Sequence, residues 1–390
     1  MPRIVKVEVV PVAMPADRSW FESGFDETLV VRLTDENGLQ GIGDCYASPA
    51  VTKPFFDMRT MHMWSRRLID VLQGADPLDR ATLWDLMYEG TIFPGRRGAA
   101  IHAISAADIA LTDLAARQVG VPVWKLLGGA RRPHCTPYAT IFPGLARGDQ
   151  TVRDLMRIIE KQFEQVIEGG YRVVKMEVLF YELCTDNQLI ELIKEGRRMI
   201  GPEITMAVDF GYRWRHWHDA KHVIDRIADS DIFFCEAPLQ HDDLPGHANL
   251  ARMSPVRIAG AEFAATRWEC REWIETGGVA VVQPGITRAG GFTEMMRIAE
   301  FADQKGVQVV PLAWHTGITA AAALHFQAAT INTPAIEYFP TYLFDSPLRA
   351  HLVSPDAEVR DGRVALPAGP GLGVTLNEEI LQRYGDGAGS

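Results

Sequence analysis

The sequence predicts an α/β protein, a (β/α)8-type barrel (a modified TIM barrel) with an α+β capping domain. Short β-branched runs alternate with amphipathic stretches from about residue 133, eight such runs follow one another, and the first 132 residues have a different pattern. Repeated βα units make parallel strands, and eight of them favour a closed barrel over an open sheet. We expect a capping domain over 1–132, the barrel over 133–345, and a C-terminal segment, 346–390, that returns to the capping domain.

The N-terminal region has the pattern of antiparallel strands followed by helices. The runs IVKVEVVPVAM and TLVVRLTDENGLQGIG alternate like strands, and DENG marks a turn inside the second run. The polar and aromatic loop PADRSWFESGFDE separates them. From about Met61 to Leu127 the pattern is helical, and Gly120 is a stop signal for the helix in AAIHAISAADIALTDLAARQVG.

The barrel strands are expected at eight runs. In chain order they are CTPYATIF, YRVVKMEV, EITMAVDF, DIFFCEAP, VRIAGAEF, VAVVQPGI, VQVVPLAW and PAIEYF, ending near residues 139, 177, 209, 236, 262, 284, 314 and 337. Helical segments such as DNQLIELIKEGRRMIG separate them. The tail from about residue 350 holds no further unit.

Composition excludes several classes of protein. The chain has 390 residues, of which 47% are hydrophobic and 23% charged, which is typical of a globular protein. A net charge of -11, with no basic block, argues against nucleic acid as a partner. No signal peptide and no apolar run of about 18 residues is present, so we expect no membrane partner. Five scattered cysteines without a CxxC suit a reducing compartment, and we predict a cytoplasmic protein.

Three acids stand at equivalent places in three neighbouring units. MAVDFG presents Asp209, FFCEAP presents Glu236, and AGAEF presents Glu262. Active sites of these barrels lie at the C-terminal ends of the strands, and three converging carboxylates would repel one another in a low dielectric. Each acid alone could be a helix N-cap or a salt-bridge partner. Three in register favour a metal site for Mg²⁺, with Mn²⁺ as the alternative.

Several longer motifs occur in the order and spacing of a known family. GRRGAAIHAISAADIALTDLAARQVGVPVWKLLGG matches its capping-domain helix and the exit to the barrel, and VDFG, CEAP and GAE match its metal-ligand strand ends. VVQPGITRAGG matches its sixth strand, PLAWHTG places His315 at the end of the seventh, and AIEYF places Glu337 on the eighth. Nearly the whole chain thus resembles the enolase superfamily, and within it the mandelate racemase subgroup.

The resemblance implies a shared chemistry. The carboxylate of a small-molecule substrate would chelate Mg²⁺, which stabilises an enediolate after the α-proton leaves. Capping-domain loops near Trp20, Phe21, Phe25 and Tyr46 would cover the barrel mouth and exclude water; alternatively, Trp20 and Phe21 pack as satellite core. Trp20 and Tyr46 are then candidate substrate-binding residues. Parallel cases in the family imply a homo-oligomer.

Two positions depart from the family pattern. The second strand usually reads Lys-X-Lys, and this chain has Lys175 and Glu177. The sixth strand usually ends in Pro-Asp, whose Asp orients the strand-seven histidine, and this chain has Pro284 and Gly285. Both arms of the usual proton-transfer machinery are therefore altered.

Lys175 and Glu177 share one face of their strand, because side chains alternate. The neighbouring carboxylate should raise the pKa of Lys175, which makes the lysine a poor base and a good partner for a substrate carboxylate. Lys175 and Mg²⁺ should depress the pKa of Glu177. Three roles for Glu177 follow: a catalytic base, a substrate-orienting or metal-linked group, or a structural ion pair.

His315 is the best proton-transfer candidate, because its reference pKa near 6.5 suits acid–base work. Without the strand-six Asp, its tautomer needs another partner, and a satisfied buried histidine is the alternative. Glu337 is a candidate to hydrogen-bond the substrate carboxylate and, if protonated, to act as an electrophile. The remaining candidates are Arg288, expected to brace the sixth-strand turn; His216 and His218, expected at the surface or facing the cap; and His241, a candidate at the mouth.

These assignments favour dehydration over racemisation. A racemase needs two acid–base groups on opposite faces of the α-carbon, and this chain has His315 and a doubtful Glu177. The sequence predicts a lyase: an Mg²⁺-dependent dehydratase that converts a sugar acid to a 2-keto-3-deoxy acid, with catalytic His315, Lys175 and Glu177. The alternatives are an epimerase or cycloisomerase of a related hydroxy acid, and a non-catalytic carboxylate-binding descendant.

Overall fold

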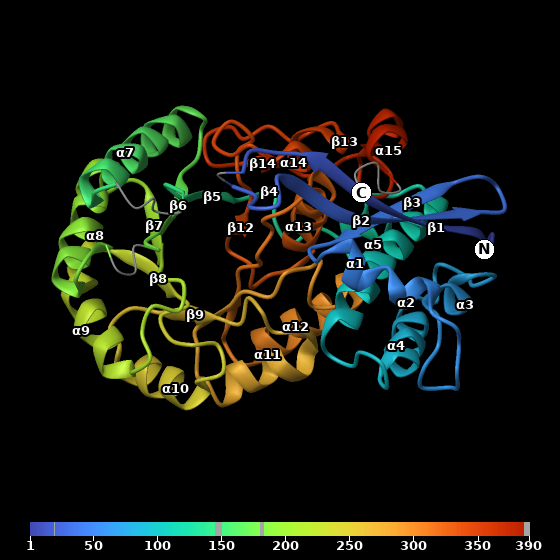
Figure 1. Cartoon of the computed structure of the whole chain (residues 1–390), viewed down its shortest axis with the longest axis horizontal. Coiled ribbons are helices and arrows are strands. Elements are labelled where there is room, and N and C mark those ends of the chain that lie inside the picture. Colours follow the sequence, from blue (N-terminus) through green and yellow to red (C-terminus); the bar gives the residue numbers. More distant parts are fainter. Residues whose placement is uncertain (19, 145–149, 180–182, 386–390) are drawn as a thin grey trace.

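A strongly curved parallel sheet with helices outside it forms one part of the molecule, and the capping domain packs beside it (Figure 1). The structure, a computed structural model, describes residues 1–390 except 19, 145–149, 180–182 and 386–390. The N-terminus and the last described helix, α15 (Glu378–Tyr384), lie on the capping-domain side of the molecule.

Eight parallel strands build the sheet, one at each run named in the sequence. They are β5 (Pro137–Ile141), β6 (Val173–Glu177), β7 (Thr205–Asp209), β8 (Ile232–Glu236), β9 (Ile258–Gly260), β10 (Val281–Val282), β11 (Gln308–Val309) and β12 (Ile336–Glu337). They follow chain order from β5 to β11, and β12 pairs with β5. The Glu337 amide donates to the Pro311 carbonyl (3.4 Å), which joins β12 to the chain after β11. The predicted (β/α)8-type barrel is confirmed.

Seven helices connect these strands. They are α7 (Val152–Glu168), α8 (Asp186–Ile200), α9 (Trp217–Ile227), α10 (Leu244–Met253), α11 (Thr266–Glu275), α12 (Gly291–Gln304) and α13 (Gly317–Ala329). On α7 the buried Leu155, Ile159, Phe163 and Val166 recur every three or four residues, which gives the helix one apolar stripe to pack on the sheet.

An apolar cluster fills the barrel beneath its mouth. Tyr138, Phe234 and Val281 belong to it, and Val173 packs against it. Because side chains alternate along a strand, Lys175 and Glu177 share the inward face of β6 with Val173. Both charged side chains therefore lie on the mouth side of this apolar cluster.

The capping domain is a three-stranded antiparallel sheet with helices. Its strands are β1 (Ile4–Pro15), β2 (Phe25–Asp35) and β3 (Gln40–Cys45), and its helices are α1 (Pro49–Thr52), α2 (Pro54–Asp57), α3 (Leu68–Leu72), α4 (Arg80–Thr91), α5 (Ala99–Val119) and α6 (Val123–Leu126). The strand β3 packs tightly on α5. A Cβ at Gly43 would lie 2.2 Å from the Ala106 carbonyl oxygen, so this crossing needs glycine.

Two sequence-based boundaries were wrong. Helix was expected from about Met61, but α3 begins at Leu68, because residues 61–65 form a tight turn in which the Met61 amide donates to Ser65 and the Ser65 amide donates to His62. The seventh strand was expected to end near Trp314, but β11 ends at Val309. Pro311 follows shortly and has no N–H to continue the ladder.

The C-terminal segment contains α14 (Pro347–His351), β13 (Val353–Ser354), β14 (Val364–Ala365), β15 (Thr375–Leu376) and α15 (Glu378–Tyr384); β14 pairs with β4 (His134–Cys135). This segment contacts the capping domain. Arg32 on β2 and Glu378 form an ion pair (2.7 Å), and the Leu372 amide donates to Asp113 on α5 (2.7 Å). The domain boundaries themselves stay a prediction.

The helix α5 is long and apolar enough to cross a membrane by length and composition. However, 89% of its apolar window is buried inside the protein, as in a core helix of a folded domain. All five cysteines are free and buried.

Candidate active site

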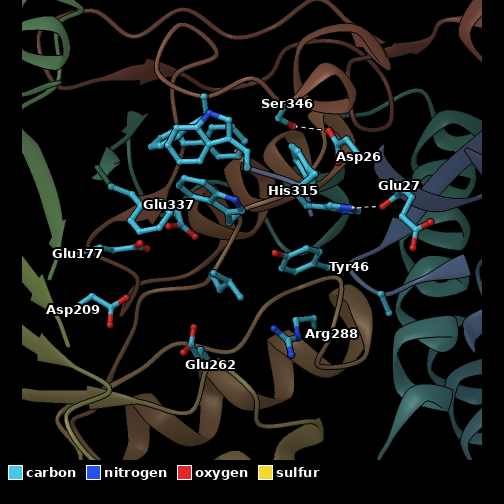
Figure 2. A pocket seen from close by; sticks show the side chains of 18 of the residues that line it. Asp26, Glu27, Tyr46, Glu177, Asp209, Glu262, Arg288, His315, Glu337 and Ser346 are labelled. Carbon is cyan, nitrogen blue, oxygen red and sulfur yellow. Dashed lines mark hydrogen bonds between the residues drawn. The ribbon is translucent and has the colours of Figure 1, made fainter. Parts of the chain in front are cut away.

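A cavity of about 560 Å³ opens at the C-terminal ends of the barrel strands. Both domains line it: β6, β7 and β12 contribute Lys175, Glu177, Asp209 and Glu337, and the capping domain contributes Tyr46 (Figure 2). The cavity therefore forms where barrel and cap meet, as the fold predicts.

Lys175 is buried at the floor of the cavity and pairs with three carboxylates. Its Nζ lies 3.0 Å from Glu236, 3.6 Å from Glu337 and 3.7 Å from Asp209. Burial opposes the charge, but the carboxylates, led by Glu236, outweigh it and raise the pKa of Lys175 well above its usual value. Lys175 is a fixed cation here and a poor base, as predicted from the sequence.

The three predicted metal ligands lie at neighbouring strand ends. Asp209 is the last residue of β7 and Glu236 the last of β8, while Glu262 follows β9 by two residues. Ala261, just before Glu262, has φ 74°. A non-glycine residue in this left-handed region costs free energy, and such strain clusters at functional sites.

Their pKa values show a shortage of positive charge. Burial is the main cause that raises the pKa of Asp209 to about 6 and those of Glu236 and Glu262 to about 7. Each of the three also raises the pKa of another through its negative charge. One lysine therefore does not neutralise this group.

The donor set fits a divalent cation in charge and chemistry, because hard carboxylate oxygens suit Mg²⁺. However, no three His, Cys, Asp or Glu side chains among the described residues are already grouped as a coordination sphere. Lys175 and Gln283 (Nε2 to Oε2, 2.7 Å) hold Glu236, and the Tyr212 hydroxyl donates to Glu262. The side chains would have to turn toward an ion to ligate it together.

Glu177 differs from its predicted electrostatics. Burial, followed by the charge of Asp209, raises its pKa well above the usual value. Lys175 lowers this pKa, as expected from the sequence, but burial and Asp209 outweigh it. The lowering expected from a bound Mg²⁺ stays a prediction.

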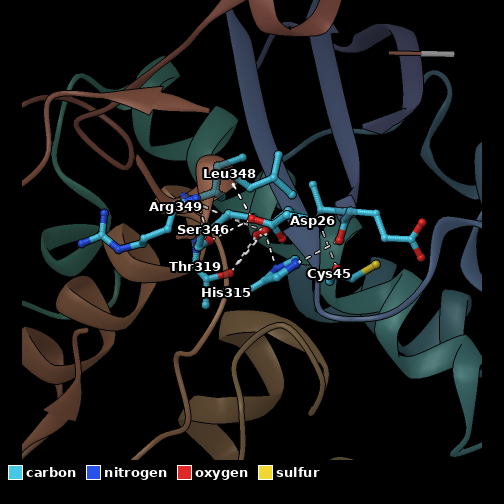
Figure 3. A network of polar contacts seen from close by, with 12 residues as sticks. Asp26, Cys45, His315, Thr319, Ser346, Leu348 and Arg349 are labelled. Carbon is cyan, nitrogen blue, oxygen red and sulfur yellow. Dashed lines mark hydrogen bonds and ion pairs between the residues drawn. The ribbon is translucent and has the colours of Figure 1, made fainter. Parts of the chain in front are cut away.

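His315 finds its partners in the capping domain. Its Nδ1 lies 3.2 Å from Asp44 Oδ2, and its Nε2 lies 3.3 Å from the Glu27 carbonyl oxygen. Asp44 is further held by the hydroxyls of Thr316 (2.6 Å) and Thr319 (3.2 Å), which follow His315 in the chain. Figure 3 shows this network joining the barrel to the capping strands.

This arrangement favours a charged His315. A carboxylate and a carbonyl oxygen are acceptors, so the two contacts are best satisfied when both ring nitrogens carry a proton. Burial opposes this charge, but Asp44 outweighs it and raises the pKa of His315. The sequence showed that the usual Asp was missing at Gly285. It gave no signal for Asp44, which lies 271 residues away in the chain.

An aromatic wall closes one side of the cavity. Trp20 packs edge-on against Phe142 (5.6 Å between ring centroids) and Phe344 (5.1 Å), and Trp314 stacks on Phe339 (4.5 Å). Trp20 thus lies in the wall of the cavity. The sequence predicted that its loop would cover the barrel mouth.

Two further candidates, Glu337 and Arg288, line the cavity. The Glu337 carboxylate accepts from the Thr140 hydroxyl (2.5 Å) and the Ala313 amide (3.0 Å), and its predicted contact with the substrate stays a prediction. Arg288 lines the cavity, with its guanidinium over Phe263 (4.8 Å), while its amide donates to the Gly285 carbonyl of the sixth-strand turn (3.0 Å).

The remaining histidines lie outside the site. His216 and His218 are exposed, as expected. His241 packs against Phe263 (5.6 Å) and Trp273 (5.0 Å), and it is absent from the described lining of the cavity. Its candidacy at the mouth was wrong.

Comparison with known families matches both halves of the chain. Residues 3–128 match the mandelate racemase / muconate lactonizing enzyme N-terminal domain, and residues 159–380 match the enolase C-terminal domain-like family. The chain belongs to the enolase superfamily. Within it, the chain falls in the mandelate racemase subgroup, as its motifs predicted.

Two superfamily relatives are sugar-acid enzymes by name. The arabinonate dehydratase of Saccharolobus solfataricus is 31% identical over 77% of this chain and 77% of its own length. The D-galactarolactone cycloisomerase of Agrobacterium fabrum is 29% identical over 91% of this chain and 90% of its own. Enzymes like this chain thus include both lyases and isomerases.

Solved superfamily structures share the whole fold. A crystal structure of a candidate racemase is 38% identical with a TM-score of 0.91, covering 98% of this chain and 97% of its own. A racemase from Streptomyces coelicolor A3(2), solved with bound magnesium, is 26% identical with a TM-score of 0.82, covering 98% and 99%.

Proposed function

We propose that this enolase superfamily member is an Mg²⁺-dependent dehydratase of a sugar acid, which it converts to a 2-keto-3-deoxy acid through an enediolate. The observation that carries the proposal is the position of Asp209, Glu236 and Glu262 at neighbouring strand ends, where Asp209 and Glu262 line the same cavity as Glu177. A group this rich in negative charge suits a metal-bound carboxylate substrate and offers a carboxylate base beside it.

Asp209, Glu236 and Glu262 would hold the ion. When bound, Mg²⁺ would polarise the substrate carboxylate and stabilise the negative charge of the enediolate. The magnesium bound to the Streptomyces coelicolor relative supports this choice, and Mn²⁺ is the alternative with the same ligand chemistry.

Glu177 is proposed as the base that removes the α-proton. It lies at the end of β6 next to Asp209 on β7, so it faces the same point as the metal ligands. Lys175 supplies a fixed positive charge to the substrate carboxylate, and Glu337, Trp20 and Tyr46 are proposed to contact the substrate.

His315 contributes a positive charge on the other side of the cavity. Its nitrogens contact the capping domain, so its predicted part in proton transfer stays a prediction. The imidazolium lies near the position where negative charge develops as the hydroxyl leaves, and a fixed charge there lowers the barrier.

The test is a library of sugar acids incubated with the purified protein and Mg²⁺, with 2-keto acid formation as the readout. We expect turnover of at least one member, abolished by EDTA and restored by Mg²⁺. No 2-keto acid from any member, combined with ligand-dependent thermal stabilisation, would show a carboxylate-binding protein and overturn the proposal.

Cycloisomerisation is the second candidate, because a 29% identical relative covering nine-tenths of the chain is a cycloisomerase. This reaction also begins with α-proton removal but loses no water. Mass spectrometry and NMR of the products separate the two reactions. A product of unchanged mass identifies the cycloisomerase, and a deoxy keto acid identifies the dehydratase.

A further inference from the structure

Tyr46 lies in the cavity wall with its hydroxyl group exposed to the cavity. It follows β3 directly, lines the cavity, and 37% of its surface is accessible. Figure 2 shows its hydroxyl pointing into the cavity, toward the side where Glu177 and Asp209 lie. No described residue forms a hydrogen bond with this hydroxyl, so it is free to meet a substrate.

Two cations lie against the Tyr46 ring. The His315 ring is 4.7 Å away between centroids with an interplanar angle of 36°, and the Arg288 guanidinium is 5.6 Å from the ring centroid. In Figure 2 these two side chains lie on opposite sides of the ring. Positive charge at an aromatic face is attractive, and the attraction grows if the phenol loses its proton.

His315 itself is poorly placed to deliver a proton. Both of its N–H groups are directed to acceptors of the capping domain, Asp44 and the Glu27 carbonyl. Figure 2 shows one ring nitrogen of His315 in contact with Glu27. His315 also lines the cavity, but its ring nitrogens contact the capping domain, whereas the Tyr46 hydroxyl, two residues after Asp44 in the chain, points into the cavity.

We propose that Tyr46 is a catalytic residue that donates the proton to the departing β-hydroxyl of the substrate. This inference rests on the proposed dehydratase function. Glu177 takes the α-proton, the electron pair of the enediolate forms the new C=C bond, the β-carbon–oxygen bond breaks, and the leaving oxygen takes the Tyr46 proton to depart as water. The tyrosinate recovers the proton that Glu177 releases, and the enol product tautomerises to the 2-keto acid.

The chemistry of the phenol suits this step. Burial raises the pKa of Tyr46 to about 12, so the hydroxyl keeps its proton at neutral pH. It is still a far stronger acid than water, whose pKa is about 15.7, so transfer to a departing hydroxide is downhill. His315 and Arg288 stabilise the tyrosinate and are positioning residues in this step.

Glu177 and Tyr46 face each other across the cavity in Figure 2. A substrate held between them would lose its proton from one side and its hydroxyl from the other. The arrangement therefore predicts an anti elimination.

The test compares Tyr46→Phe with the wild-type enzyme on a sugar acid that the wild type dehydrates. We expect dehydration to fall by about 10²–10⁴-fold, the usual contribution of a general acid, while exchange of the α-proton with D₂O continues. Tyr342→Phe, which alters an exposed tyrosine outside this cavity, is the matched control and should leave both rates unchanged.

A fluorinated substrate separates acid catalysis from a structural defect. Fluoride needs no proton to leave, so Tyr46→Phe should eliminate it from the 3-deoxy-3-fluoro analogue at the wild-type rate. Equal loss of both eliminations, or dehydration at the wild-type rate, would overturn the role of Tyr46. If the wild type itself neither dehydrates nor exchanges any library acid, the proposed function fails instead.

Discussion

At the scale of single residues, Asp44 decides the state of His315. The histidine sits at the barrel rim, but its charge is set by a carboxylate on capping strand β3. The sequence identified His315 and showed that the Asp that usually orients it is replaced by Gly285. It could not find Asp44, because sequence spacing carries no information about a contact between two domains.

Replacing this carboxylate should change stability in a pH-dependent way. The pKa of His315 is raised above its reference value, so the charged ring stabilises the fold below about pH 6.5, and this contribution is lost as pH rises through the folded-state pKa. Asp44→Asn should therefore lower the free energy of unfolding more at about pH 6 than at about pH 9, by about 1.4 kcal/mol per pKa unit.

Denaturant unfolding at the two pH values measures the difference, and NMR titration of the His315 ring gives its pKa directly. The Asp26 carboxylate also faces His315 from β2, and Asp26→Asn serves as a comparison with a smaller effect. An equal loss of stability at both pH values would show that Asp44 acts through its threonine hydrogen bonds alone.

Glu177 offers a second test at this scale, because three roles follow from the sequence. As a base, Glu177→Gln should reduce α-proton exchange by about 10²–10⁴-fold and leave Mg²⁺ affinity unchanged in titration calorimetry. Loss of Mg²⁺ binding would instead make Glu177 a metal ligand. Loss of thermal stability with normal exchange would make it a structural group.

At the scale of elements, strand ends were predicted well where they carry the chemistry. The strands β6, β7, β8 and β12 end at the expected residues, 177, 209, 236 and 337. The strands β10 and β11 are shorter than the apolar runs that mark them, because prolines interrupt the ladder after each. The hydrophobic pattern alone does not show where a proline, which lacks an N–H, ends the strand.

The contact of β3 with α5 sets where Asp44 and Tyr46 lie, and glycine makes it possible. Gly43→Ala would push a Cβ against the backbone of Ala106, so we expect a loss of about 1–3 kcal/mol in unfolding free energy, as for overpacked cores. Gly285→Ala is the control, because its Cβ would meet its nearest neighbour at an ordinary 3.4 Å.

Thermal unfolding measures both variants. The Gly43→Ala protein should also lose activity, because a shift of β3 moves Asp44 and Tyr46 together. An unaltered melting temperature in Gly43→Ala would show that α5 moves aside at little cost.

At the scale of the whole molecule, the buried carboxylates predict that divalent cations stabilise the folded protein. Mg²⁺ that binds only the folded state should stabilise it by about 2.7 kcal/mol at 100 times its Kd. Differential scanning fluorimetry with increasing MgCl₂ should show this shift in the wild type and not in Glu262→Gln. A shift of the same size in the variant would exclude Glu262 as a ligand.

The whole-molecule architecture was the most predictable part of the protein. Eight βα units, the order of the motifs and the position of the cap all follow from local patterns that span nearly the entire chain. The arrangement of side chains between the two domains was not predictable. Arg288 entering the cavity and Glu27 facing His315 depend on how the cap sits on the barrel.

The contact between Asp44 and His315 has a consequence for inheritance and engineering. A chimera that joins this barrel to the cap of a relative would keep Lys175 and its carboxylates, but the new cap would have to supply its own Asp44, Glu27 carbonyl and Tyr46. The two halves of this enzyme are therefore not interchangeable modules, and selection on the barrel histidine acts on capping-domain residues as well.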